Sequence, residues 1–362
     1  AGALGEARFL LRDGLVWEGG EGLYESLQVG IDDLRERVVF RNSPVEVREL
    51  RVEQQQKTGK RESLHLVLDG TEWRLKQPVE GRADPVAAQR FVTAVASLRV
   101  DDFIPGQVRY PDRQPDVVVE VRGTRGEETV RLWDEGGALF GRLPDRGVTF
   151  GAGSRQYDAV FVNAVEELRA RILLPLGESS FEELFELVID PGQGRGDRLR
   201  LVRAGVANDW RLVEPVEFPA HPTPCNEAAY ALQRLVAREF VTGDAVAPPD
   251  QRDRYGLSGD RLSLTVRSGE RRELATLWVG NELERNGERL AYACRSDEPH
   301  NVALVLAEPV DTLRRPWTDY CDRQVVRQTA TVERLELAHR DGRERAFVNV
   351  DGRWRVEGEE RD

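Results

Sequence analysis

Short runs in which apolar and polar residues alternate recur along the chain, and they predict β-strands joined by tight turns. The run Leu-His-Leu-Val-Leu at residues 64–68 leads through Asp69-Gly70 to Trp73-Arg74-Leu75. Because Asp-Gly favours a two-residue turn between strands, these residues predict a β-hairpin. Two further pairs of runs have the same design, at 199–202 with 210–212 across Ala204-Gly205, and at 346–350 with 354–356 across Asp351-Gly352.

After each of the first two hairpins, apolar residues recur at steps of three and four positions. This spacing predicts one amphipathic helix after each hairpin. Asp84 is a suitable N-cap for the first helix, and Pro85 suits its first turn. The second helix is expected to start at Thr223 and Pro224. The apolar faces would be formed by Ala87, Ala88, Phe91, Val95 and Leu98, and by Ala228, Ala229, Leu232, Leu235 and Val236.

Each predicted helix is followed by four short apolar runs bounded by turn residues. The strands expected from these runs are 117–121, 129–133, 138–143 and 159–162, and then 262–266, 274–278, 290–294 and 302–306. Two-residue alternation within them indicates one buried and one solvated face. The predicted fold class is therefore α+β, with mainly antiparallel sheet and one amphipathic helix in each half.

Internal repetition is the main organising feature of the sequence. Trp73 and Trp210 each open a Trp-Arg-Leu-x-x-Pro-Val segment, and Trp354 opens a partial copy. A further junction, rich in leucine and arginine, begins at Leu34, Leu168 and Leu313. We therefore expect tandem repeats, with the tail of a preceding repeat at 1–33, complete repeats at 34–167 and 168–312, and the start of a third at 313–362.

Composition narrows the classes of partner. The 362 residues are 40% hydrophobic and 32% charged, with a formal net charge of −12. This balance argues against a nucleic acid or an anionic membrane surface as the partner. No apolar run is long enough to span a bilayer, and the N-terminus lacks the order of a signal peptide. Because the chain contains no methionine, we expect it to be a fragment.

Residues that commonly bind metals or cofactors are few and scattered. Cys225, Cys294 and Cys321 lack the clustered spacing of a zinc site, although a bridge between Cys294 and Cys321 stays open. The four histidines are His65, His221, His300 and His339, and no two of them have the spacing of metal ligands. We expect no metal and no cofactor.

Catalytic motifs are equally weak. The Gly-x-Gly-x-Gly run in 190–197 lies between two predicted strands, whereas a phosphate cradle needs a helix N-terminus, so this run predicts a hairpin tip. The adjacent carboxylates of 182–183 and 359–360 diverge in either regular structure, and we expect them to be solvated. No serine or cysteine stands in a nucleophile motif. We therefore predict no catalytic residues and no enzyme activity.

The tryptophans and the arginine-rich junctions each allow two interpretations. Trp73 and Trp210 precede a proline bend, where a large ring most simply seals a core, but a ligand-stacking role is the alternative. Alternating arginines that enter a strand could bind an acidic partner, or could bridge carboxylates such as Glu36 and Glu167 between repeats. These arginines are Arg35, Arg37, Arg169 and Arg171.

The order of these segments resembles the domain-of-unknown-function family 4340. The resemblance is carried by the leucine–arginine junction, the Trp-Arg-Leu-x-x-Pro-Val hairpin, the alanine-rich helix, Asp-Arg-Tyr-Gly-Leu at 253–257 and Leu-Trp-Val-Gly at 277–280. The first copy departs from this order, because Tyr110-Pro111-Asp112 stands where Tyr-Gly-Leu is expected. The resemblance implies a bacterial protein tethered by a membrane helix upstream of Ala1, with its repeats outside the cytoplasm. It also implies an association with ABC transporters of the gliding-motility type, and it supplies no catalytic residues.

Three functions follow as expectations. The first is a non-catalytic extracytoplasmic scaffold or interaction module with a protein partner in the cell envelope, and the candidate partner is a component of an ABC transport system. The second is an envelope module that grips a glycan or peptide with exposed aromatic side chains. The third is an envelope hydrolase whose acid, base or nucleophile converge from different repeats. Exposure of Trp73, Trp133, Trp210 and Trp278 distinguishes the first two.

Overall fold

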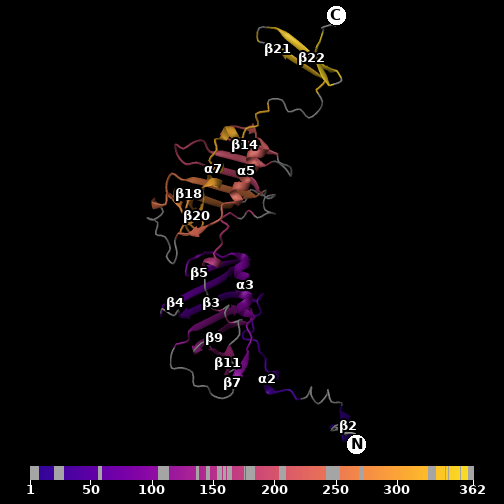
Figure 1. Ribbon diagram of the computed structural model, residues 1–362, viewed down its shortest axis with the longest axis vertical. Helices are drawn as coiled ribbons and strands as arrows, with labels where there is room; N and C mark the ends of the chain where they lie inside the picture. Colours follow the sequence, from indigo (N-terminus) through magenta and orange to yellow (C-terminus); the bar gives the residue numbers. More distant parts are fainter. Residues whose placement is uncertain are drawn as a thin grey trace.

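The computed structural model describes the greater part of the chain. The described residues are 8–19, 28–55, 59–104, 114–135, 138–143, 147–152, 157, 160, 165–174, 176, 184–203, 209–241, 253–268, 273–324, 332–338, 340, 342–350 and 352–357. Two large β-sheets follow one another along the molecule, with a hairpin beyond the first and a small sheet beyond the second (Figure 1). The expected α+β class, with mainly antiparallel sheet, is confirmed.

The first large sheet has nine antiparallel strands in the order β6-β5-β4-β3-β8-β9-β10-β11-β7. Its strands are β3 (Val47–Gln55), β4 (Arg61–Asp69), β5 (Glu72–Gln77), β6 (Gly81–Arg82), β7 (Asp102–Ile104), β8 (Val117–Gly123), β9 (Gly126–Glu135), β10 (Ala138–Leu143) and β11 (Val148–Ala152). Helix α3 (Pro85–Ala96) follows β6, and the carboxylate of Asp84 accepts a hydrogen bond from Ala87 N at 2.8 Å. The predicted N-cap and start of this helix are confirmed.

The second large sheet also has nine antiparallel strands, in the order β15-β14-β13-β12-β17-β18-β19-β20-β16. Its strands are β12 (Leu184–Asp190), β13 (Leu199–Arg203), β14 (Trp210–Glu214), β15 (Phe218–Pro219), β16 (Glu239–Phe240), β17 (Leu262–Ser268), β18 (Glu273–Arg285), β19 (Glu288–Arg295) and β20 (Ala303–Leu306). Helix α5 (Pro222–Gln233) starts one residue before the predicted Thr223. The reason is local, because the ring of His221 caps the helix by accepting a hydrogen bond from Thr223 N at 3.2 Å.

Corresponding residues take corresponding places in the two sheets. Trp73 lies in β5 and donates to Gln89 of α3 at 3.2 Å, while Trp210 lies in β14 and donates to Asn226 of α5 at 3.0 Å. In both halves, the residue before the helix also bonds to the segment that follows the sheet. Asp84 N donates to Leu168 O and His221 N donates to Tyr320 O, each at 2.8 Å.

Each sheet has its own apolar core beneath its helix. The first contains Leu66, Val92 and Val119, and the second contains Leu201, Leu232 and Leu264. Helix α7 (Ala307–Leu313) completes the second core, where Leu313 is fully buried. The segment that follows includes the short 3₁₀-helix η4 (Trp317–Asp319) and forms a β-bridge to Ala220 at Cys321.

Two smaller pieces lie near the ends of the chain. The hairpin β1 (Arg8–Arg12) and β2 (Leu15–Gly19) turns at Asp13-Gly14. The sheet of β21 (Arg334–Ala338), β22 (Glu344–Val350) and β23 (Arg353–Val356) carries Trp354, which is 47% exposed. Among the described residues, no helix combines the length and the apolar character needed to cross a membrane.

Several predicted elements differ from the structure. The leucine–arginine junctions, expected to enter strands, begin at the last residue of the short helices α2 (Ile31–Leu34) and α4 (Val165–Leu168) and then form only single bridges, such as Ile172 to Val236. The predicted strand 159–162 lies outside the described residues except for Val160, which is not in a strand. The central strands β3 and β12 were not predicted. A bulge between Val47 and Glu49 interrupts the alternation of β3, and β12 is buried on both faces over much of its length.

Candidate functional site: the joint between the two sheets

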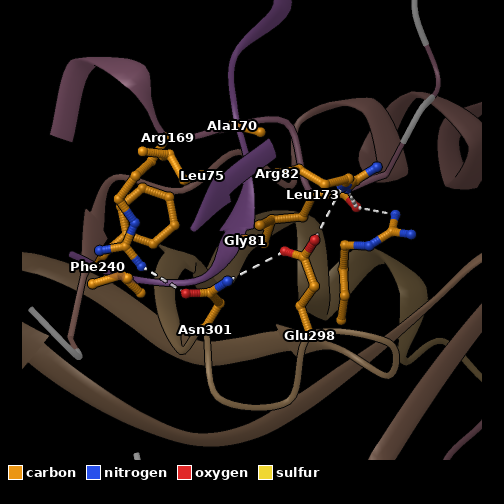
Figure 2. Close-up of a pocket in the computed structure, with 11 residues that line it drawn as sticks. Leu75, Gly81, Arg82, Arg169, Ala170, Leu173, Phe240, Glu298 and Asn301 are labelled. Carbon is orange, nitrogen blue, oxygen red and sulfur yellow. Dashed lines mark hydrogen bonds and ion pairs between the residues drawn. The ribbon is translucent and has the colours of Figure 1, made fainter. Parts of the chain in front are cut away.

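The two large sheets meet where the turn before β6 lies against the loop between β19 and β20 (Figure 2). The first sheet contributes Glu80, Gly81 and Arg82, and the second contributes the loop residues 295–301. The connecting segment after α4 runs through the same place with Arg169 and Leu173. Segments far apart in the sequence therefore form one polar joint.

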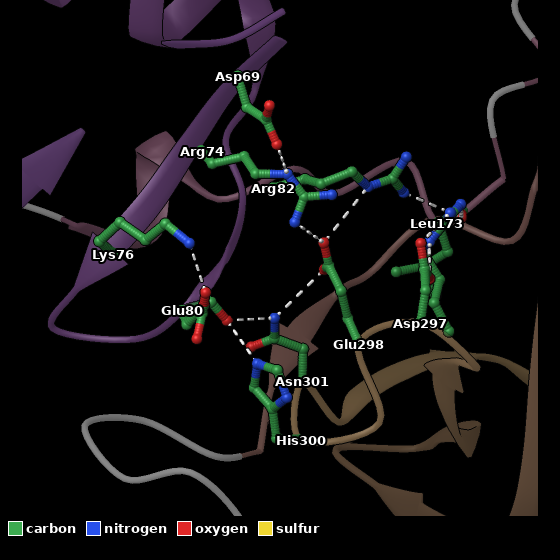
Figure 3. A network of polar contacts seen from close by, with 11 residues as sticks. Asp69, Arg74, Lys76, Glu80, Arg82, Leu173, Asp297, Glu298, His300 and Asn301 are labelled. Atoms are coloured by element: carbon green, nitrogen blue, oxygen red, sulfur yellow. Dashed lines mark hydrogen bonds and ion pairs between the residues drawn. The ribbon is translucent and has the colours of Figure 1, made fainter. Parts of the chain in front are cut away.

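Asn301 makes the central contacts of this joint (Figure 3). Its side-chain amide donates to the carbonyl oxygen of Glu80 at 2.8 Å and to Oε2 of Glu298 at 3.3 Å. Its amide oxygen accepts from Arg169 Nη2 at 3.0 Å. The ring of His300 contacts the same Glu80 carbonyl at 2.7 Å through Nε2. Asn301 thus links both sheets and the segment that connects them.

Arg169 connects the joint to the second core. Its side chain is 4% exposed, and its guanidinium carbon lies 3.6 Å from the centre of the Phe240 ring. It also pairs with Glu166 at 3.4 Å. Burial lowers the pKa of Arg169, and the carboxylate of Glu166 opposes that shift. This buried cation therefore contacts an aromatic face, a carboxylate and an amide oxygen, and these contacts tie the connecting segment to the second sheet.

Glu298 supplies the buried negative charge opposite two guanidinium groups. One of its oxygens, Oε1, lies 3.7 Å from Arg74 Nη1 and 3.7 Å from Arg82 Nε. Burial and the nearby positive charge of Arg295 lower the pKa of Arg82. The carboxylate of Glu298 acts against this shift. The charges come from both sheets, so separating the sheets would break these ion pairs and expose the charged groups to water.

Leu173 joins the two arginines through its backbone. Its carbonyl oxygen accepts from Arg295 at 3.0 Å and from Arg82 at 3.4 Å. Arg295 is only 7% exposed and holds Asp297 with two hydrogen bonds of 2.8 Å. Burial alone would raise the pKa of Asp297, but the hydrogen bonds and charge of Arg295 together with the charge of Arg82 outweigh it, and the pKa falls. These bonds hold the loop of the second sheet in one conformation.

The enclosed space at the joint is small. Its cavity measures about 20 Å³, whereas small-molecule sites usually enclose roughly 300–1,000 Å³. Among the described residues, no group of three or more histidines, cysteines or carboxylates is placed to hold a metal ion. The arrangement is suited to holding two β-sheets together.

The tryptophans lie mainly in the cores. Trp73, Trp133 and Trp210 are 5%, 7% and 2% exposed. Trp278 is half-buried, and the guanidinium carbon of Arg261 lies 3.8 Å from its ring centre. Three of the four indole rings are therefore buried from solvent, and the fourth has the guanidinium of Arg261 over one face.

Other residues singled out from the sequence are dispersed. Of the three histidines that the structure describes, His65 contacts Glu49 at 2.9 Å within the first sheet, His221 caps α5, and only His300 lies at the joint. His339 and the carboxylate pairs 182–183 and 359–360 lie outside the described residues. The glycine-rich run 190–197 joins β12 to β13, so the predicted hairpin tip is confirmed.

The junction arginines and the cysteines have separate local roles. Arg35 pairs with Asp32, Arg37 donates to the carbonyl of Asp101, and Arg171 donates to that of Arg238. Only Arg169 of the four reaches the loop of the second sheet. None of the three cysteines, all of which the structure describes, forms a disulfide, and Cys294 and Cys321 pack against different apolar clusters.

Sequence reasoning missed Gly81, Glu298 and Asn301. No spacing rule marks them, because each acts through a neighbour distant in the chain. The available signal was the turn-rich stretch Ser-Asp-Glu-Pro-His-Asn at 296–301 between two predicted strands, which resembles an ordinary surface loop.

Two of the motifs that carry the resemblance, Asp-Arg-Tyr-Gly-Leu at 253–257 and Leu-Trp-Val-Gly at 277–280, lie against each other. Asn281 N donates to Tyr255 O at 2.8 Å, and a Cβ on Gly280 would lie 2.1 Å from that same oxygen. Gly256 has a φ of +69°, so the turn at Tyr255-Gly256-Leu257 favours glycine. The strand packed against this turn needs glycine at position 280, because a side chain there would clash with the turn. Residues 210–362 match the family model of a domain of unknown function, DUF4340.

The DUF4340 match starts at Trp210 in β14 and includes α5, β17–β20, α7 and the small C-terminal sheet. It therefore contains the loop of the second sheet that enters the joint, but not the first sheet. The resemblance to DUF4340 proposed from the sequence is confirmed for this part of the chain. No curated protein and no solved structure matches the chain.

Proposed function

We propose that this protein is a non-catalytic scaffold of tandem units that works outside the cytoplasm as an accessory to an ABC transport system. The observation that carries the proposal is the joint, where Asn301 binds Glu80 and Arg169 and where Glu298 faces arginines of the first sheet. Buried polar contacts of this kind fix a relative geometry, which is the property that a scaffold needs. Localisation and transporter association enter through the resemblance to DUF4340 alone.

We propose further that the two sheets are copies of one repeating unit. Their strand orders correspond, and Trp73 and Trp210 donate from corresponding strands to the following helix. The small sheet with Trp354 in β23 would then be the start of a further copy. Stacked units of this kind contact mainly their neighbours and offer extended surfaces to partners.

The second sheet leaves the counterpart of the joint surface exposed. Val79 of the first sheet is 4% exposed, while Val216, at the same place after its tryptophan, is 43% exposed. Phe218 of β15 is 44% exposed. Asp209, Arg211 and Glu217 border a hollow beside it. An apolar patch with a charged border is typical of a protein interaction site, so we place the partner surface there.

The glycan-gripping alternative is weakened by the burial of Trp73, Trp133 and Trp210 and by the cation over Trp278. The hydrolase alternative would need a convergent set of titratable groups in a cleft. At the joint, the buried charges pair with each other in a cavity of about 20 Å³.

The test combines affinity capture with an activity screen, both on the full chain. We expect capture of an identified ABC transporter component from a bacterial envelope fraction, and no turnover in a hydrolase and transferase screen. Phe218→Asp should reduce capture, whereas Val86→Asp, on the exposed face of α3, should not. Turnover that a single substitution abolishes without changing the thermal melt would overturn the scaffold proposal.

A further inference from the structure

The cavity at the joint contains two polar atoms that the protein itself leaves without a hydrogen bond. They are Nε of Arg82, a donor, and Oε1 of Glu298, an acceptor. The two atoms lie 3.7 Å apart, beyond hydrogen-bond distance, and the side chain of Glu298 is 9% exposed. Figure 2 shows both side chains directed toward the same space beside Gly81 and Leu173.

A third group lies beside the same oxygen of Glu298. Arg74 Nη1 also lies 3.7 Å from Oε1 of Glu298, so two guanidinium groups surround one carboxylate oxygen without a direct hydrogen bond (Figure 3). Buried polar groups are nearly always satisfied by protein or by ordered water. A small bridging group between these atoms would satisfy the donor and the acceptor together.

The chemistry selects the bridging group. An anion could accept from Arg82 but would be repelled by Glu298, and a cation could bind Glu298 but would be repelled by Arg82 and Arg74. A water molecule can accept from a guanidinium and donate to the carboxylate at once. The cavity of about 20 Å³ exceeds the roughly 10–15 Å³ that one water requires.

We propose that one water molecule is bound inside the joint, where it accepts from Arg82 Nε and donates to Glu298 Oε1. Arg74 Nη1 lies 3.7 Å from the same Oε1, and with it the water would have three partners, the number typical of a buried water. Since Arg74 and Arg82 belong to the first sheet and Glu298 to the second, this water is part of the contact between them. Its structural importance rests on the proposed function of the joint, but its presence can be decided separately.

The experiment is a high-resolution crystal structure of the full chain, grown in bromide. We expect one peak within hydrogen-bond distance of Arg82 Nε and Glu298 Oε1, without anomalous signal from bromide. In Arg82→Met, which removes the donor, the peak should be lost, and in the exposed control Lys76→Met it should persist.

Two results would overturn the proposal. An anomalous bromide peak would identify an anion site, and a direct hydrogen bond between Arg82 Nε and Glu298 Oε1 with no peak would leave no site for water. Neither result depends on whether the chain captures a transporter component. Failure of the water site and failure of the scaffold function are therefore distinguishable.

Discussion

Asn301 of the second sheet lies so close to Gly81 of the first that a Cβ on Gly81 would be 2.3 Å from Asn301 Nδ2. The same Nδ2 donates to the carbonyl of Glu80, one residue earlier. The missing side chain at position 81 is therefore what lets the loop of the second sheet reach the backbone of the first. The joint depends on a close approach between two small, uncharged groups as much as on its buried ions.

Gly81→Ala should disturb the joint while both sheets stay folded. The added methyl group would displace Asn301, and overpacking of this kind costs about 1–3 kcal/mol. We expect a larger radius of gyration by small-angle X-ray scattering and faster hydrogen exchange in residues 295–301. Gly151→Ala is the control, because its Cβ would meet only ordinary contacts at 3.9 Å. Unchanged scattering and exchange in Gly81→Ala would show that the contact does not hold the sheets together.

Trp210→Ala should destabilise the second sheet by about 3–5 kcal/mol, the usual range for removal of a buried aromatic side chain. Trp210 is 2% exposed and donates to Asn226, so both packing and a hydrogen bond would be lost. Trp354→Ala is the matched control, since Trp354 is 47% exposed. The free energy of unfolding should fall by less than about 1 kcal/mol in Trp354→Ala. Urea unfolding followed by circular dichroism measures both, and similar losses would contradict the assignment of Trp210 to the core.

His65 should make stability depend on pH. Burial and Arg51 lower the pKa of His65 below its ordinary 6.5, although the contact with Glu49 opposes the shift. The folded state therefore favours the neutral ring, and the unfolded chain takes up a proton first as the pH falls. The stabilisation is present above pH 6.5 and is lost as the pH falls through the lower folded pKa.

The measurement for His65 is the urea midpoint between about pH 8 and about pH 5, the range in which histidine changes charge. His65→Gln should lose less stability than the unmodified protein over the acid part of this range. Parallel curves for the two proteins would mean that the ring titrates alike in the folded and unfolded chains.

The cysteines should react at very different rates with a maleimide. Burial, with a smaller contribution from the nearby Cys321, raises the pKa of the Cys225 thiol to about 12. Cys294 is also fully buried, whereas Cys321 is half-buried. We expect Cys321 to be labelled first, as located by peptide mass spectrometry, and the other two only after unfolding. Cys321→Ser should abolish the early labelling, and early modification of Cys225 would show that the second core opens readily.

Local elements were predictable wherever neighbouring residues determine them. The predicted hairpin between β4 and β5 turns at Gly70-Thr71, one residue later than Asp69-Gly70, and Gly70 has a φ of +62°. The start of α3 depends on Asp84 and Pro85, which are adjacent in the sequence. By contrast, β3 was missed because its bulge and its polar exposed face weaken the two-residue pattern.

The sequence by itself determined the α+β class, most of the outer strands, the two helices and the resemblance to DUF4340, because these depend on local patterns and on their order. Only the tertiary structure decided the joint. Asn301 meets Glu80 across 221 positions of the chain, and Arg169 meets Asn301 across 132. Such contacts follow from how completed sheets pack, and a glycine, an amide and an isolated carboxylate have no distinguishing pattern until packing brings them together.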